Sequence, residues 1–189
     1  MRNYSGAMES NRALLPGEYA VLGLLAIEPA HGYEVNRRWQ ESPLTELLPI
    51  EQSVLYGYLR TLERRGFLDW EEHRVGNRPP RRVFALSEEG WEYLRPWLRS
   101  PVERMREVRL DLLLKLYFLE EIDPRAVVRL IAEQVMVCRR YEERAELRLR
   151  EAEGFARLIA ESRLTAVRAT RAWLSSHVPE EPTRSRIAS

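Results

Sequence analysis

The chain is poor in the residues that build disulfides, metal sites and membrane spans. Cys138 is the only cysteine among 189 residues, so no intrachain disulfide is possible, which fits a reducing compartment. The three histidines, His31, His73 and His177, lack metal-ligand spacing, and we expect neither a metal nor a cofactor. The longest apolar run, residues 20–27, is far shorter than the roughly 20 residues that cross a bilayer. Because the N-terminus also lacks the apolar region of a signal peptide, we expect a cytoplasmic protein without membrane contact.

Motifs of common enzyme classes are also missing. The sequence has no glycine-rich phosphate loop, no nucleophile elbow and no histidine–carboxylate pairing with useful spacing, so we predict no catalytic residue and no enzyme. The formal net charge is only +1, whereas DNA-binding proteins are often strongly basic. Charge is unevenly distributed, however, since residues 73–82 contain four arginines and no acid. Such a patch dominates at contact distance because salt screens charges beyond about 8–10 Å.

The most informative segment is an amphipathic helix predicted at residues 50–65. Leu55, Leu59 and Leu62 recur at helical spacing and line one face. The opposite face carries a small, cationic and hydroxyl-bearing set: Ser53, Tyr56, Gly57, Arg60 and Arg64. A face of this chemistry suits entry into the major groove of DNA.

Two strands with a turn between them follow this helix. Gly66 is typical of a helix end. Residues 67–74 are rich in aromatics suited to a strand, residues 75–80 form the tip of a hairpin, and residues 81–86 form the returning strand. A recognition helix followed by a β-hairpin is the winged form of the helix-turn-helix.

The remaining pattern is helical. We predict further N-terminal helices at residues 16–27, 31–41 and 87–98, and C-terminal helices at 108–119, 124–153 and 155–178. The long helix places apolar-leaning residues at nearly heptad spacing: Val127, Ile131, Val135, Cys138, Tyr141, Ala145, Leu149 and Ala152. A helix of about 45 Å overshoots a small domain and needs a partner. The fold class is therefore mainly α with a small β-hairpin.

The domain organisation follows from these elements. It comprises a tail at residues 1–14, a winged helix-turn-helix domain at 15–99, a coiled-coil-like helical dimerisation domain at 100–178 and a second tail at 179–189.

Several segments together resemble the PadR family of bacterial transcriptional regulators. They are Leu22-Gly23-Leu24-Leu25, residues 29–35 with the sequence PAHGYEV, the recognition-helix segment 55–68, the wing segment 78–90 and residues 111–118. The likeness covers residues 15–120 well and 121–178 loosely. It implies a dimer that binds operator DNA, usually as a repressor, and that dimerises through its C-terminal helices. The chain departs from the family pattern at Ser53, Val54 and Gly57, which bears on the operator sequence and affinity.

Seven residues are candidates for DNA contact: Ser53, Tyr56, Arg60, Arg64, Arg78, Arg81 and Arg82. We expect the helix residues to contact bases or phosphates, and the wing arginines to contact phosphates without reading sequence. The alternatives are a solvated helix face, packing of Tyr56 at the rim, and wing arginines that only solubilise a turn. His31 is interpreted as a helix cap or core residue rather than a pH switch, and Cys138 as a buried thiol rather than a redox sensor.

We expect six residues in a dimer interface: Leu116, Ile131, Val135, Cys138, Tyr141 and Trp173. The five tryptophans are mainly expected to anchor the core or an interface. One or two of them are candidates for a pocket between subunits that binds a flat aromatic effector.

The leading hypothesis is a homodimeric transcriptional repressor. Helix 50–65 and wing 73–82 would bind palindromic double-stranded operator DNA, with half-sites about one turn (34–36 Å) or a multiple apart. A small aromatic effector would release the DNA. The competing hypothesis is a winged-helix protein-interaction module that does not bind DNA, which the near-zero net charge favours.

Overall fold

The structure is a computed structural model that describes residues 12–74 and 81–177. Its internal contacts divide the chain into two units, which are described separately. The first unit comprises Met1–Ser100 and Val108–Asp123, and the second comprises Pro101–Glu107 and Pro124–Ser189.

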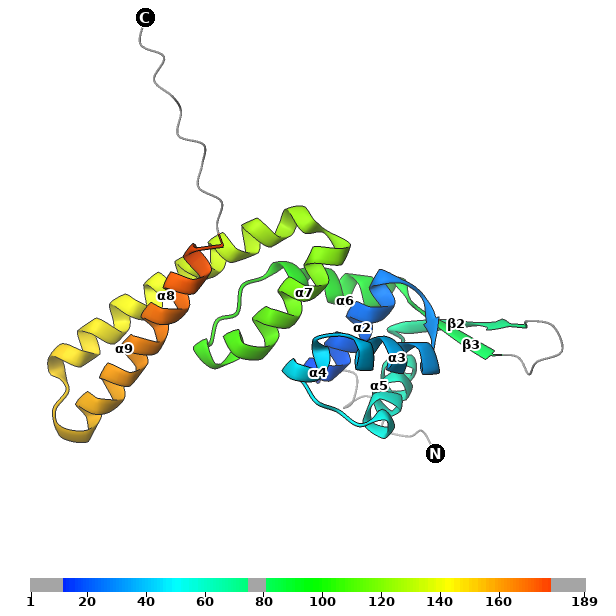
Figure 1. The fold of residues 1–189 in the computed structure, drawn as a ribbon, viewed down its shortest axis with the longest axis horizontal. Helices are drawn as coiled ribbons and strands as arrows, with labels where there is room; N and C mark the ends of the chain where they lie inside the picture. The colour runs from blue at the N-terminus through cyan, green and yellow to red at the C-terminus, as the bar shows by residue number, and fades with distance from the viewer. Residues whose placement is uncertain (1–11, 75–80, 178–189) are drawn as a thin grey trace, which may run out of the picture. The chain divides into compact units, whose positions relative to one another are not determined.

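The first unit contains the predicted order of three helices, a hairpin and a further helix, with the short helix α4 added between the second and third helices (Figure 1). Its helical segments are α2 (Pro16–Ile27), α3 (Gly32–Glu41), α4 (Leu44–Leu47), α5 (Gln52–Arg64), α6 (Glu88–Arg99), the π-helix η2 (Val108–Leu112) and α7 (Leu113–Ile122). The winged-helix architecture predicted from the sequence is therefore confirmed, with helix ends that differ from prediction by a few residues.

Local hydrogen bonds explain where these helices begin. His31 caps α3, because its Nδ1 accepts a hydrogen bond from the backbone N–H of Glu34 at 3.1 Å. The cap interpretation of His31 is thus confirmed. Ser87 caps α6, since its Oγ accepts from the N–H of Gly90 at 3.0 Å and donates to the carbonyl of Gly66 at 2.6 Å. The second bond ties the start of α6 to the turn that ends α5.

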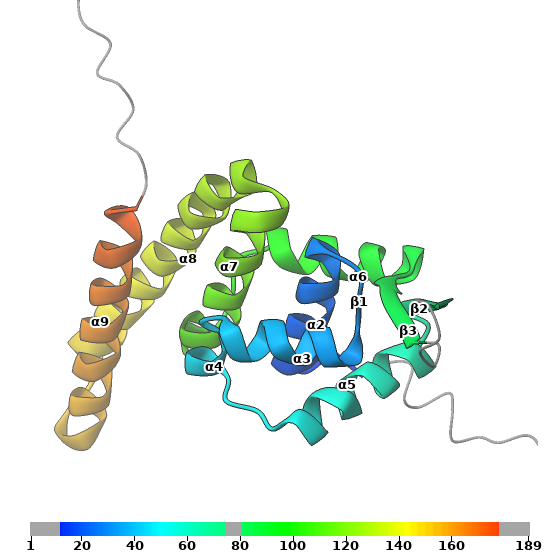
Figure 2. The ribbon, with the colours of Figure 1, turned by 45° about the vertical axis from the view of Figure 1, so that its right-hand side comes forward.

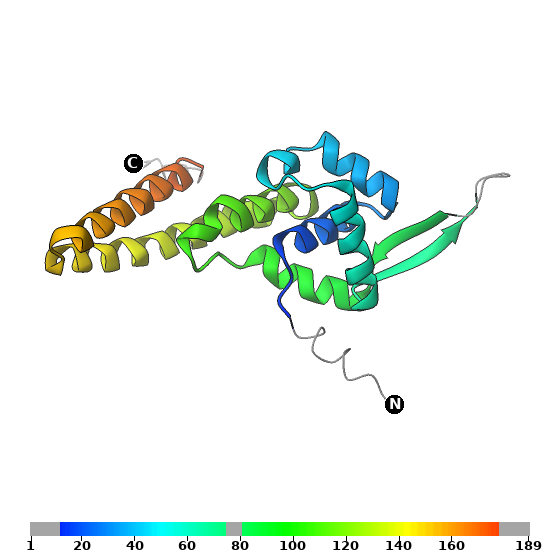
Figure 3. The same ribbon diagram turned by 90° about the horizontal axis from the view of Figure 1, so that it is seen from below.

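The sheet has three antiparallel strands in the order β1-β3-β2. β2 (Leu68–His73) and β3 (Arg81–Leu86) form the predicted hairpin, which projects beyond the C-terminal end of α5 (Figure 3). β1 (Ala30–His31) pairs with β3 and was not predicted. It brings the start of α3 beside the returning strand of the wing.

The core of the first unit lies between α2, α3, α5 and α6. Fully buried side chains from all four helices meet there, among them Leu22, Val35, Trp39, Leu55, Leu62 and Leu94. Each such side chain contributes about 1.5–3 kcal/mol on burial. This core fixes the orientation of α5 and therefore the direction of its exposed face.

Residues 108–123, which lie beyond the predicted boundary at residue 100, make their contacts with the first unit. Phe118 of α7 packs directly over Gly23 of α2, where an added Cβ would lie 2.6 Å from the ring. Lys115 donates a 2.8 Å hydrogen bond from Nζ to the carbonyl of Ser100 and lies 5.0 Å from the ring centroid of Trp97. These contacts connect residues far apart in sequence, which helical periodicity does not reveal.

The second unit is a helical hairpin. α8 (Pro124–Glu151) and α9 (Gly154–Ser175) lie side by side and antiparallel (Figures 1 and 3). Gly154 makes the reversal with φ +54°, a left-handed conformation that glycine adopts without strain. The Glu142 carboxylate accepts hydrogen bonds from Arg168 and Arg171, each at 2.8 Å. The long helix therefore has a packing partner within its own chain.

A short segment of residues 101–107 is held against α8. It contains the 3₁₀ helix η1 (Met105–Glu107). The fully buried Gln134 side chain accepts a hydrogen bond from the N–H of Val102 at 2.7 Å and donates to its carbonyl at 3.0 Å.

None of the helices in the described residues has the length and apolar character needed to cross a membrane.

The residues predicted for a dimer interface differ in exposure. Ile131, Val135 and Cys138 are buried within one chain, so they have little surface left to lose to a partner. Tyr141 is half-buried in the second unit, and Leu116 is half-buried in the first. Trp173 is 41% exposed and retains surface for an interface. Cys138 is fully buried, and burial raises the pKa of its thiol, which supports the structural interpretation over a redox sensor.

Candidate nucleic-acid interface

Helix α5 separates an apolar face from a polar one, as its sequence pattern predicts. Leu55, Leu59 and Leu62 point into the core, with exposed fractions of 2% or less. Ser53 and Arg60 are exposed on the other side. Within the described residues, no hydrogen bond or ion pair engages the guanidinium of Arg60, so its donors are available to a ligand. Figure 2 shows α5 leading toward the hairpin.

Arg64 extends this surface by one turn. It is exposed on the last turn of α5, close in sequence to the start of the wing. Arginine presents up to five donors in a planar fork, which matches a guanine edge or a phosphate. Ser53, Arg60 and Arg64 therefore form a polar edge of the kind that reads DNA.

Tyr56 packs at the rim of this surface, and its contact with DNA stays a prediction. It is half-buried, and its ring covers the first residue of α3, since an added Cβ on Gly32 would lie 2.7 Å from Cε1 of Tyr56. Packing against α3 accounts for the half-buried position of the Tyr56 ring. The close approach also explains why residue 32 is a glycine.

Arg82 of the wing is engaged within the molecule. Its Nη1 donates to Oε1 of Glu63 on α5 at 3.3 Å, and its guanidinium carbon lies 4.0 Å from the ring centroid of Trp70 on β2. The guanidinium therefore connects the recognition helix to both strands of the wing. These contacts hold the wing against α5, and the phosphate contact of Arg82 stays a prediction.

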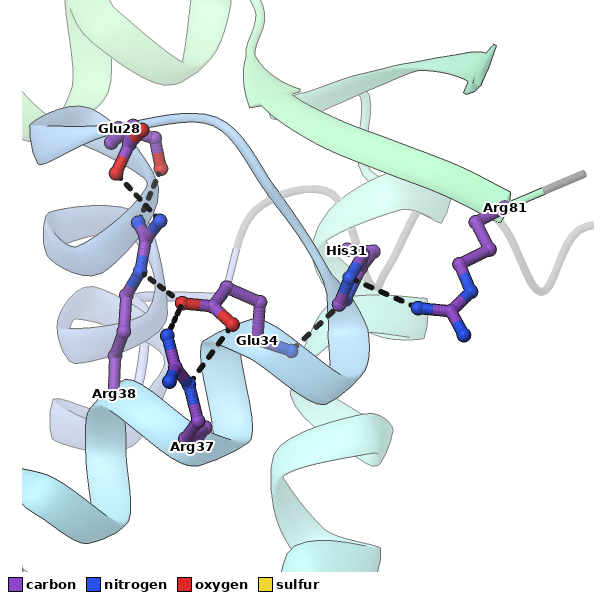
Figure 4. A network of polar contacts seen from close by, with 6 residues as sticks. All are labelled: Glu28, His31, Glu34, Arg37, Arg38 and Arg81. Atoms are coloured by element: carbon purple, nitrogen blue, oxygen red, sulfur yellow. Dashed lines mark hydrogen bonds and ion pairs between the residues drawn. The ribbon is translucent and has the colours of Figure 1, made fainter. Parts of the chain in front are cut away.

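Arg81 lies near the start of α3. Its Nη1 is 3.5 Å from Nε2 of His31, the residue whose Nδ1 caps that helix (Figure 4). Arg81 and the neighbouring Arg74 are both exposed. Arg82 is exposed as well, whereas Arg78 lies outside the described residues.

Neighbouring arginines on α3 are neutralised by acids (Figure 4). The Glu34 carboxylate accepts hydrogen bonds from Arg37 at 2.6 Å and from Arg38 at 3.2 Å, and Arg38 also binds the Glu28 carboxylate at 2.6 Å. The hydrogen bond from Arg37 holds the pKa of Glu34 below its usual range. This network fixes the start of α3 to the end of α2 and adds little positive charge to the surface.

The wing also carries negative charge that the hairpin-tip pattern did not indicate. Asp69, Glu71 and Glu72 are exposed on β2, and Glu72 lies directly opposite Arg82 in the strand register. Positive charge is therefore concentrated on the α5 edge and on the β3 end of the wing. Among residues 12–74 and 81–177, no cluster of acids, histidines or cysteines has the makeup of a metal site.

Comparison with known proteins bears on this surface. Residues 21–96 match the model of the transcriptional regulator PadR-like family, a span that contains α3, α5 and the wing and parts of α2 and α6. The negative transcriptional regulator PadR of Bacillus subtilis is 25% identical over 118 residues, which cover 62% of this chain and 64% of that protein. The chain thus matches slightly less than two thirds of the length of this curated relative.

Solved structures give weaker likenesses. B. subtilis PadR in complex with operator DNA aligns with a TM-score of 0.43 and 21% identity, covering 86% of this chain and 97% of that one. The smu.1604c protein of Streptococcus mutans aligns with a TM-score of 0.42 and 22% identity, covering 87% of this chain and 99% of that one. B. subtilis PadR in complex with p-coumaric acid aligns with a TM-score of 0.41 and 21% identity, covering 87% of this chain and 97% of that one.

Proposed function

We propose that the protein regulates transcription by binding double-stranded operator DNA through α5 and the wing, because residues 21–96 match the model of the transcriptional regulator PadR-like family. The observation that carries the proposal is the exposed edge of Ser53, Arg60 and Arg64, held outward by a leucine face that is buried. This family comprises regulators rather than enzymes, in agreement with the absence of catalytic motifs from the sequence.

The proposed roles divide the surface into contacts and supports. Arg60, with Ser53 and Arg64, enters the major groove and contacts base edges. Arg81 and Arg74 contact the flanking phosphates. Tyr56 and Arg82 support the surface from within, through the packing on Gly32 and the contacts with Glu63 and Trp70.

We further propose a homodimer built by the second unit. Its helices expose several large apolar side chains, at fractions of 41% to 74%: Met136, Leu147, Phe155, Leu158 and Trp173. Apolar surface of this kind is typical of a protein interface. Two DNA-binding units related by a two-fold axis would read palindromic half-sites about 34–36 Å apart. Sedimentation velocity should give a dimer for the wild type and a larger monomer fraction for Phe155→Ser with Leu158→Ser.

The direction of regulation is proposed to be repression, in line with the name of the B. subtilis relative. A reporter fused to the regulated promoter should rise when the gene is deleted. Release by a small aromatic effector remains a prediction from the sequence. Of the five tryptophans, Trp39 is fully buried, Trp97 stacks on Tyr19 at 4.1 Å and Trp91 is half-buried beside Arg95. Trp70 and Trp173 are the exposed candidates.

The direct test is retardation of the DNA upstream of the protein's own gene, with unrelated DNA of equal length as competitor. Arg60→Ala should abolish sequence-specific retardation. Arg109→Ala removes an equally exposed arginine from η2 and should leave retardation unchanged. If the wild type retards both DNAs equally or neither, the protein-interaction module becomes the better interpretation.

A further inference from the structure

A groove of about 730 Å³ runs between α8 and α9 within the second unit. Its wall is mainly aliphatic and built from small residues: Ala145, Ala152, Ala156, Ala160, Ala166 and Val167. Alanines at these positions keep the facing helices from filling the space between them. The volume lies within the range of about 300–1,000 Å³ that small-molecule sites occupy.

Three arginines, Arg144, Arg148 and Arg163, line this groove, together with a single acid, Glu151. The formal charges of the three arginines and the glutamate sum to +2. Within the described residues, no hydrogen bond or ion pair engages any of the three guanidinium groups. The large apolar residues proposed for the dimer interface do not line the groove, so the two features are carried by different side chains.

Several other arginines of the hairpin have acidic partners. Arg168 and Arg171 bind Glu142 across the helix pair, and Arg157 binds Glu161 along α9. The three arginines of the groove instead lie together beside an apolar wall without such a partner among the described residues. Three like charges beside an apolar wall repel one another, and an anion placed among them would relieve that repulsion.

We propose that the α8–α9 groove binds an amphipathic carboxylate with an aliphatic chain. The carboxylate would accept charge-assisted hydrogen bonds from the arginines, which suit its two oxygens. The aliphatic tail would lie along the alanines and valine. Tyr141 is the only aromatic residue of the wall, so the surface favours an alkyl chain over a flat ring. Binding at this groove is independent of the proposed DNA interface.

Dodecanoate is a suitable probe, used below its critical micelle concentration with the full-length wild type and titrated calorimetrically. Dodecanol has the same chain without charge, and dodecyltrimethylammonium has the opposite charge. We expect dodecanoate to bind about tenfold or more tightly than either, since one charge-assisted hydrogen bond contributes about 1.5–3 kcal/mol. Equal binding of dodecanol would overturn the proposal.

The variant arm compares two triple substitutions of equal charge. Arg144→Gln, Arg148→Gln and Arg163→Gln should weaken dodecanoate binding at least about tenfold. The control replaces three exposed arginines of α8 that do not line the groove, Arg125, Arg139 and Arg150, by glutamine and should change binding less than about twofold.

Circular dichroism checks that both triple variants fold. If the groove variant does not fold, the single substitution Arg148→Gln replaces it. Equal weakening by both triples would refute the assignment, because it would indicate non-specific attraction to a cationic surface. Sedimentation in the same buffers tests a second copy as the occupant. If the groove variant dissociates a dimer while dodecanoate does not bind the wild type, the groove is a subunit contact and the proposal fails.

Discussion

Replacing Arg82 by methionine tests whether this arginine orients the wing through contacts within the protein or binds a phosphate of DNA. The substitution keeps an aliphatic stem over Trp70 but removes the ion pair with Glu63 at 3.3 Å and the cation–π contact at 4.0 Å. Glu63 is 30% exposed and Arg82 is 53% exposed, so solvent screens the pair. An exposed ion pair contributes about 0.2–1 kcal/mol and an exposed cation–π contact about 0.5–1 kcal/mol. We therefore expect Arg82→Met to lower the free energy of unfolding by about 1 kcal/mol in urea titrations.

The DNA-binding readout distinguishes the two roles. Each phosphate contact contributes about 0.9 to the slope of log affinity against log salt concentration. Because Glu63 already neutralises Arg82, Arg82→Met should weaken binding through a misoriented wing while the slope stays unchanged. Arg81→Met, the matched variant on the same strand, should flatten the slope by about 0.9. Fluorescence anisotropy titrations at four salt concentrations provide both values.

Glu63→Gln completes the test. This substitution removes the carboxylate partner of Arg82. If Arg82 then contacts a phosphate, the slope of log affinity against log salt concentration should become steeper. A slope that falls by about 0.9 in Arg82→Met would refute the orienting role and restore a phosphate contact.

Three further predictions concern the scaffold. Gly90→Ala should destabilise the first unit severely in urea unfolding, because the added Cβ would lie 2.2 Å from the backbone carbonyl oxygen of Phe67; unfolding within about 0.5 kcal/mol of wild type would contradict this packing. Cys138 should react with a thiol reagent only after unfolding, since it is buried and its thiol pKa is raised, and rapid labelling of the native protein would disprove its burial. Hydrogen bonds from Arg168 and Arg171 lower the pKa of Glu142, so this contribution to stability is present above the unfolded pKa and disappears as the pH falls below about 4. Glu142→Gln should flatten that acid limb of the stability profile, and an unchanged limb would count against the pairing.

Local signals made much of the first unit predictable. Pro16 begins α2 and Ser87 caps α6 as their residue types indicate, and the leucine repeat of α5 separates its buried face from its exposed one. The hairpin strands also lie where the aromatic-rich segment and the turn residues predicted them. Each of these features depends on neighbours within a few positions along the chain.

Features that depend on distant residues were not predictable in this way. The two-residue strand β1 exists because β3 pairs with it, and neither residue carries a strand signal of its own. The packing of Phe118 on Gly23 joins α7 to the first unit across about half the chain. The contact between Arg82 and Glu63 likewise forms only when the wing folds back beside α5. Charge counting along the sequence therefore could not reveal that Arg82 has an acidic partner in the fold.

The most direct measurement is dimethyl sulfate protection on the DNA upstream of the gene, with the wild type and Arg60→Ala. This reagent methylates guanine N7 in the major groove, where an arginine from α5 would bind. The account predicts protected guanines in two half-sites about 34–36 Å apart, with protection lost at one guanine per half-site in the variant. Protection confined to adenine N3 in the minor groove, or a pattern unaffected by Arg60→Ala, would contradict it.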